Sequence, residues 1–142
     1  MKTSARNQYA GTIRHVENGP VSTEVTIEIA GGHLLAATLT TASAQRMKLH
    51  AGQAAIALVK ASSVVLVTDA DGYLLSARNQ LAGTVARVER GAVSTVVGLS
   101  LPGGADVTAT VTNDAVDELG LRVGQAATAI FKAYQVFVAV KA

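Results

Sequence analysis

Residues 4–8 read Ser-Ala-Arg-Asn-Gln, and the same five letters return at residues 76–80, exactly 72 positions later. The same offset, without a gap, relates Gly11-Thr12 to Gly83-Thr84, Gly52-Gln53 to Gly124-Gln125, and Lys60-Ala61 to Lys132-Ala133. About 29 of the 64 positions from Ser4 to Val67 are identical to their partners. Identity at this level without an insertion indicates a duplicated domain.

Within each repeat the hydrophobic pattern is mostly that of β-strands. Apolar residues and threonine alternate with polar residues from Val21 to Ile29, which is typical of a strand with one buried face. We expect strands at residues 8–16, 21–29, 34–40, 54–59 and 64–68, with Gly31-Gly32 as a hairpin turn and a short helix within residues 42–49. In the second repeat we expect Asn113 or Asp114 to begin the helix and Gly120 to end it.

Five short strands, with one helix between the third and the fourth, are the element order of an OB-type barrel. The sequence therefore predicts an all-β protein with two tandem OB-fold-like five-stranded barrels, each with one short helix between strands 3 and 4. We expect the first domain to span residues 1–68 and the second residues 76–142. Residues 69–75, in an acidic and turn-rich stretch, form the expected linker.

The bulk composition limits the class of protein. The chain has 142 residues, of which 49% are hydrophobic and 15% charged, so it is too apolar to be disordered. It is also more apolar than a small monomer can readily bury, which predicts subunit contacts. Cysteine is absent, so disulfides and thiolate chemistry are excluded. No signal segment or membrane span is recognisable, and we expect a cytoplasmic location.

Enzymatic and nucleic-acid-binding functions find little support. His15, His33 and His50 have no histidine counterparts in the second repeat, so we expect neither direct metal coordination nor catalytic residues. A phosphate-binding loop and a nucleophile elbow are also lacking. The net charge is only +2 and aromatic residues make up 4%, which is too little for a stacking surface on single-stranded nucleic acid.

A set of polar residues is instead present in both repeats. Ser4 and Arg6 stand two apart on an extended segment, so we expect their side chains on one face, and Lys60 follows a strand of small and apolar residues. Threonines recur on the third strand at 38 and 40, and at 110 and 112. Such groups can all donate hydrogen bonds, and no repeated carboxylate accompanies them. This chemistry favours a fully deprotonated oxyanion and leaves sulfate, molybdate and tungstate open.

With these motifs the sequence resembles the molbindins, small molybdate-binding proteins built from Mop-like domains. The resemblance covers essentially the whole chain and rests on Ser-Ala-Arg-Asn-Gln at the start of each repeat, Gly-Thr shortly after it, and Lys-Ala after the fourth strand. It implies a homotrimer of two-domain chains that holds molybdate or tungstate between subunits. Because no DNA-binding or nucleotide-binding segment is recognisable, the resemblance is to the stand-alone form.

The resemblance also implies particular site residues. At each site, one subunit contributes the opening Ser and Arg, the Lys, and the backbone N–H of the residue after the Lys. A neighbouring subunit contributes a second set of residues, which lie near its own helix. The first set comprises Ser4, Arg6, Lys60 and Ala61 in one repeat and Ser76, Arg78, Lys132 and Ala133 in the other. The second set comprises Thr40, Ser43 and Thr112. Ala115 replaces Ser43 in the second repeat, so sites lined by the second helix are expected to bind more weakly. Axial oxyanion sites are implied at Val21, Ser22, Val93 and Ser94.

The sequence thus predicts intracellular molybdenum storage or homeostasis. Two alternatives stay open: an OB-fold nucleic-acid-binding protein, and a regulatory module that senses molybdate.

Overall fold

The computed structural model describes residues 1–142 and contains two five-stranded antiparallel sheets. The first repeat contains β1 (Asn7–Asn18), β2 (Ser22–Ile29), η1 (Ala30–Gly32), β3 (Leu34–Thr40), α1 (Thr41–Arg46), β4 (Ala54–Val59), η2 (Ala61–Ser63) and β5 (Val65–Val67). The second contains β6 (Asn79–Arg90), β7 (Ser94–Ser100), β8 (Asp106–Thr112), α2 (Asn113–Leu119), β9 (Ala126–Phe131), η3 (Ala133–Gln135) and β10 (Phe137–Ala139). The predicted fold class is confirmed, and neither α-helix has the length and apolarity to cross a bilayer.

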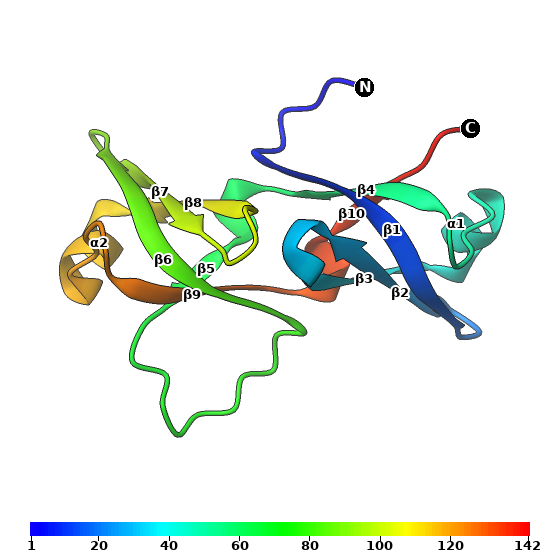
Figure 1. Cartoon of the computed structure of the whole chain (residues 1–142), viewed down its shortest axis with the longest axis horizontal. Coiled ribbons are helices and arrows are strands. Elements are labelled where there is room, and N and C mark those ends of the chain that lie inside the picture. The colour runs from blue at the N-terminus through cyan, green and yellow to red at the C-terminus, as the bar shows by residue number, and fades with distance from the viewer.

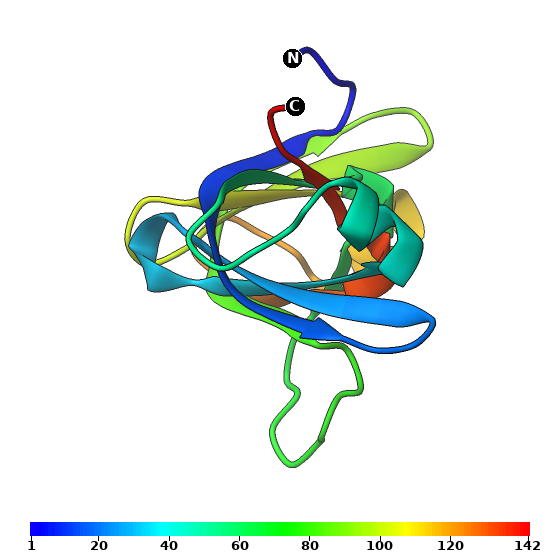
Figure 2. The ribbon, with the colours of Figure 1, turned by 90° about the vertical axis from the view of Figure 1, so that its right-hand side faces the viewer.

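The two repeats exchange their last strands. The first sheet has the order β10-β4-β1-β2-β3 and the second β5-β9-β6-β7-β8, so each sheet takes its fifth strand from the other repeat. Figure 1 shows β10 in the lobe of the first repeat and β5 in the lobe of the second. The expected boundary at residue 68 would have kept β5 with the first barrel. In space, each sheet combines segments of both repeats, while residues 68–78 form an extended loop beside them (Figure 2).

The alternating pattern of the second strand produces the buried face that the sequence predicts. Thr23, Val25, Ile27 and Ile29 are all buried, whereas Val21, which precedes β2, is 78% exposed. One cluster of buried apolar side chains contains residues from both repeats. The two sheets are therefore stabilised by a shared core, as the exchanged strands require.

The helix N-caps differ from the expected ones. Thr40 and Thr112 are the N-caps, and their Oγ1 atoms accept hydrogen bonds from the backbone N–H groups of Ser43 and Ala115. Asn113, expected as a cap, instead accepts a hydrogen bond from Thr95 Oγ1. Threonine precedes each helix directly and its hydroxyl reaches the third helical N–H, so the cap falls one residue earlier than expected. The predicted stop at Gly120 is confirmed, with φ at +59°.

The asparagine of each opening motif joins the two repeats. Asn79 Oδ1 accepts from Ala36 N–H at 2.8 Å, and Asn79 Nδ2 donates to Ala36 O at 2.9 Å. Asn7 makes the equivalent pair of bonds with the backbone of Thr108, both at 2.8 Å. Ala36 and Thr108 lie on β3 and β8, the edge strands of opposite sheets. Each buried amide therefore satisfies backbone groups that have no neighbouring strand.

The β2–β3 and β7–β8 loops meet where the two lobes adjoin. His33 Nε2 lies 2.7 Å from Pro102 O, and a Cβ added at Gly103 would collide with Gly31 Cα. Gly103 also has a φ of +87°, a backbone conformation that disfavours other residues. Glycine is required here both by the contact and by the backbone.

We therefore expect Gly103→Ala to destabilise the protein by more than the strain of a left-handed backbone alone. The neighbouring Gly104 has a φ of +98° but open space around its Cβ, so Gly104→Ala is a matched control. Chemical denaturation should show a loss of about 1 kcal/mol for Gly104→Ala and roughly 2–4 kcal/mol for Gly103→Ala. Equal losses of stability in the two variants would show that the contact between the loops does not contribute to the free energy of unfolding.

Candidate functional site

The first candidate pocket is formed by residues of both repeats. Ser4, Lys60 and Ala61 line an open pocket of about 620 Å³ together with Thr110 on β8 and Phe137 on β10. Three of the predicted residues are thus brought together within a single chain. No carboxylate lines this pocket. Thr110 completes it from the other repeat, a placement that the sequence alone did not provide.

The second candidate pocket is defined by the equivalent residues of the second repeat, Ser76, Lys132 and Ala133. Lys132 Nζ donates a hydrogen bond of 3.2 Å to Ser76 Oγ. Ala133 follows directly and begins η3, which packs against β3 as η2 packs against β8. Thr38 on β3 occupies the position that Thr110 occupies on β8. The lysine, the serine and the start of the short 3₁₀ turn therefore gather twice, once in each half of the chain.

Arg6 is not among the residues that line the pocket of Ser4. The chain bends at Ser4 and at Arg6, and regular strand structure begins only at Asn7, so the expected alternation does not apply. Arg6 instead lines an adjacent pocket of about 400 Å³ with Tyr9 and Asp106. Burial raises the pKa of the Tyr9 phenol, and the charge of Asp106 raises it further. Tyr9 stays a neutral donor there, and its hydroxyl donates to Asp106 O at 2.7 Å.

Arg78 forms an ion pair instead of pointing at an open pocket. Its two terminal nitrogens donate to the two carboxylate oxygens of Glu24 on β2, each at 2.7 Å. The Arg78 side chain is 60% exposed and that of Glu24 is 28% exposed. Glu24 is not predictable as a site residue from the repeat, because the second repeat has Val96 at the equivalent position.

The residues expected to serve a neighbouring subunit lie elsewhere in the chain. Thr40 and Ser43 are at the start of α1 and Thr112 is at the start of α2, and the two helices occupy opposite ends of the molecule (Figure 1). None of the three lines the pocket of Ser4 and Lys60. Thr40 Oγ1 also donates to Ser43 Oγ at 2.9 Å, so the hydroxyl groups of the first helix are held together.

The residues of the implied axial sites lie at the β1–β2 and β6–β7 hairpins. Ser22 O accepts from Gly19 N–H at 3.0 Å and Ser94 O accepts from Gly91 N–H at 2.8 Å, which closes each turn. Val21 and Val93 are 78% and 81% exposed. Their side chains are therefore available to contact another molecule.

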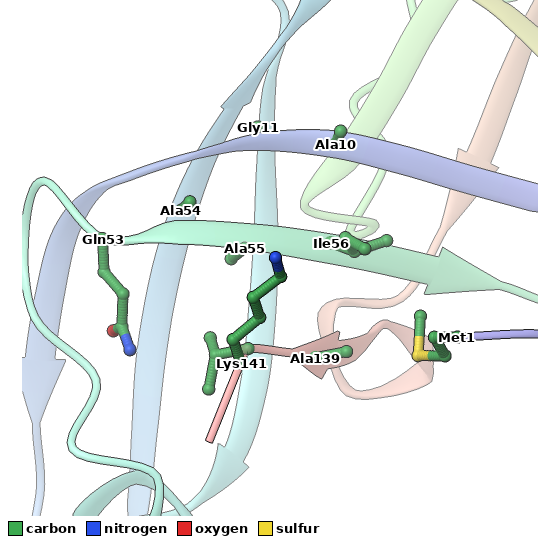
Figure 3. A pocket seen from close by; sticks show the side chains of 10 residues that line it. Met1, Ala10, Gly11, Gln53, Ala54, Ala55, Ile56, Ala139 and Lys141 are labelled. Atoms are coloured by element: carbon green, nitrogen blue, oxygen red, sulfur yellow. The ribbon is translucent and has the colours of Figure 1, made fainter.

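Other features offer no comparable set of donors. The pocket in Figure 3, about 570 Å³, is lined mainly by apolar side chains, and Lys141 is its only charged residue. His50 Nδ1 lies 2.8 Å from Lys48 O, within its own loop. No group of three or more His, Cys, Asp or Glu residues is close enough to hold a metal ion.

The fold and the paired pockets define a class of protein: a tandem OB-type protein whose two barrels exchange strands and share their pockets. The chain belongs to the TOBE domain family, which it matches twice, over residues 3–66 and 75–138.

Solved and curated proteins are similar to this chain over nearly its whole length. The structure of the cytoplasmic molybdate-binding protein ModG, with molybdate bound, superposes with a TM-score of 0.96 at 48% identity and covers 99% of this chain and 100% of that one. The molybdenum transport protein ModE of Herbaspirillum seropedicae is 63% identical over 99% of this chain. The molybdenum-pterin-binding protein MopA of Rhodobacter capsulatus is 41% identical over 98%. The chain spans about half, 52%, of the length of both curated relatives.

Proposed function

We propose that this protein binds molybdate at the two pockets described above. The observation that carries the proposal is the repeated meeting of a lysine with a serine hydroxyl, Lys60 with Ser4 in one pocket and Lys132 bonded to Ser76 in the other. Cationic and hydroxyl donors without a lining carboxylate, as in the first pocket, favour a dianion whose oxygens only accept hydrogen bonds. Tungstate has the same charge and tetrahedral shape, so we propose that it binds as well.

The similar proteins described above favour molybdate as the ligand. The ModG structure carries molybdate by its own description, and the relatives are named for molybdenum transport or molybdenum-pterin binding. ModG matches the present chain over its full length, and both repeats therefore have counterparts in a molybdate-bound protein.

We propose that the sites are completed between subunits of a homotrimer. Exposed apolar side chains surround the pockets: Phe137 is 63% exposed and lines the first, and Tyr134 is 70% exposed and follows Lys132-Ala133. Such residues usually mark an interface. A neighbouring subunit would bring Thr40 and Ser43, or Thr112, against these pockets from its helix ends. The exposed Val21 and Val93 would place Ser22 and Ser94 near the symmetry axis.

The proposed role is storage or homeostasis of molybdate in the cytoplasm, without catalysis. A second role rests on the same sites. The chain spans 53% or less of its curated relatives, and one of these, from Escherichia coli, is a DNA-binding transcriptional dual regulator that is 36% identical. Molybdate binding here could therefore serve as the sensing half of a regulator. Comparing the oligomeric state and small-angle scattering profile with and without molybdate separates the roles, because a sensor must change between states.

The first test is thermal denaturation with sodium molybdate. Binding to the folded assembly alone stabilises it by mass action, by about 2.7 kcal/mol at a ligand concentration 100-fold above Kd. For a chain of this length that corresponds to a rise of roughly 5–10 °C in Tm. Sodium chloride of equal ionic strength is the control for screening. An identical Tm in both salts at millimolar concentration would reject the proposed ligand.

A further inference from the structure

The two pockets are not chemically equal. Arg78, two residues after Ser76 of the second pocket, has both of its terminal nitrogens bonded to the Glu24 carboxylate at 2.7 Å. The residue at the Glu24 position in the second repeat is Val96, which cannot form such a pair with Arg6. Asp106 lines the pocket of Arg6, yet none of the four ion pairs of the chain involves Arg6.

The strand register places this difference at the pockets themselves. Val96 lies directly opposite Thr110 across β7 and β8, and Thr110 lines the first pocket. Glu24 lies directly opposite Thr38 across β2 and β3, at the equivalent place. Directly opposed residues of an antiparallel pair have side chains on the same face, close to each other. An apolar side chain therefore adjoins the first pocket, and a carboxylate adjoins the second.

We propose that Glu24 is an affinity-determining residue that acts as an internal competitor for the oxyanion at the second pocket. This inference rests on the proposed function. An arriving dianion meets a negative charge beside the pocket, and it gains the donors of Arg78 only by displacing Glu24 from them. The first pocket has no such competitor at this position. One chain thus carries two grades of site, a tighter one at Lys60 and a weaker one at Lys132.

The ion pair itself contributes little to folding. The Arg78 side chain is 60% exposed, and ion pairs between exposed side chains typically stabilise a fold by about 1 kcal/mol or less. Replacing Glu24 should therefore leave the fold intact, and any change in anion binding can be attributed to the pocket. Glu28, on the same strand, pairs with Arg14 at 3.3 Å, does not line the first pocket and lies opposite Leu34 instead of Thr38, which makes it a matched control.

The experiment is isothermal titration with sodium molybdate. Lys60→Ala weakens the first sites and leaves the second ones to be measured alone. In that background Glu24→Gln, nearly isosteric but uncharged, should tighten binding about tenfold, because it removes both the repulsion and the competition. Glu28→Gln should leave the affinity unchanged. In the Lys132→Ala background, Val96→Glu should weaken the remaining first sites by about the same factor.

The outcomes separate this inference from the function on which it rests. If the unmodified protein takes up no molybdate, the proposed function is wrong and the inference falls with it. If the unmodified protein binds molybdate but Glu24→Gln leaves the affinity of the second sites unchanged, or weakens it, Glu24 is not a competitor. In that case molybdate binding stands and the inference alone is overturned.

Discussion

Replacing Asn79 with alanine is expected to lower the free energy of unfolding by about 2–4 kcal/mol, a large effect for a single polar substitution. The Asn79 amide is 1% exposed, and it both donates to and accepts from the backbone of Ala36 on the edge strand β3. Alanine would leave a buried N–H and a buried carbonyl without partners. Unpaired buried groups cost the full desolvation energy.

Denaturation by urea, followed by circular dichroism, measures this loss. Gln80 is the matched control: it adjoins Asn79, is exposed, and donates only to the nearby Leu75 and Ala77 carbonyls. We expect Gln80→Ala to change stability by less than about 0.5 kcal/mol. Asn7→Ala should resemble Asn79→Ala, since Asn7 bonds to Thr108 in the same way. Similar stabilities for Asn79→Ala and Gln80→Ala would mean that the amides do not hold the repeats together.

The second large effect concerns the ligand. We expect replacement of both Lys60 and Lys132 by alanine to lower the affinity for molybdate by about 10- to 100-fold, since each ammonium group supplies a charge-assisted hydrogen bond to the anion. The molybdate-dependent rise in Tm should then nearly disappear. The single variants should each retain part of it, because the other pocket remains.

Lys141→Ala is the control for the loss of positive charge. Lys141 lines the apolar pocket of Figure 3 and lies outside both candidate sites. Thermal denaturation of all variants with and without molybdate gives the comparison. If Lys141→Ala reduced the molybdate-dependent rise in Tm by the same amount, the rise would be due to general electrostatic attraction and not to binding at the two pockets.

The repeat and the strand pattern made most of the fold predictable. Strands expected at residues 34–40 and 54–59 have those bounds in the structure. The strand exchange was not predictable from sequence for a physical reason. Val65 pairs with Ile130, and Phe137 pairs with Leu58. Val65 and Phe137 are equivalent positions of the two repeats, and so are Leu58 and Ile130. Each fifth strand therefore pairs with the other repeat in a register that the fourth strand of its own repeat also offers. Strand pattern and register therefore do not distinguish the two possible partners.

The candidate site was predictable only in part. Ser4, Lys60 and Ala61 meet in one pocket as expected, because the lysine follows a strand that pairs with the first strand of the repeat. Thr110 joins them from the other repeat, and this contact depends on the arrangement of the two lobes. The sequence repeat predicts site residues only where the two copies are identical. Glu24 differs between the copies, and only the geometry of its ion pair with Arg78 revealed it.

The asparagine of the opening motif illustrates the same limit. It is identical in both repeats, but its position in the sequence does not indicate what it contacts. The structure shows that Asn7 and Asn79 bind edge-strand backbone in the opposite sheet. The motif thus combines two tasks within four residues: the serine lines a pocket, and the asparagine joins the repeats.

The central claim, that donor-lined pockets bind molybdate in an assembly of several chains, is tested most directly by native mass spectrometry of the protein with and without sodium molybdate. We predict an assembly of three 14.5 kDa chains that gains the mass of bound molybdate, with the added mass lost in the Lys60→Ala, Lys132→Ala double variant. A monomer, or an assembly whose mass molybdate leaves unchanged, would contradict the claim.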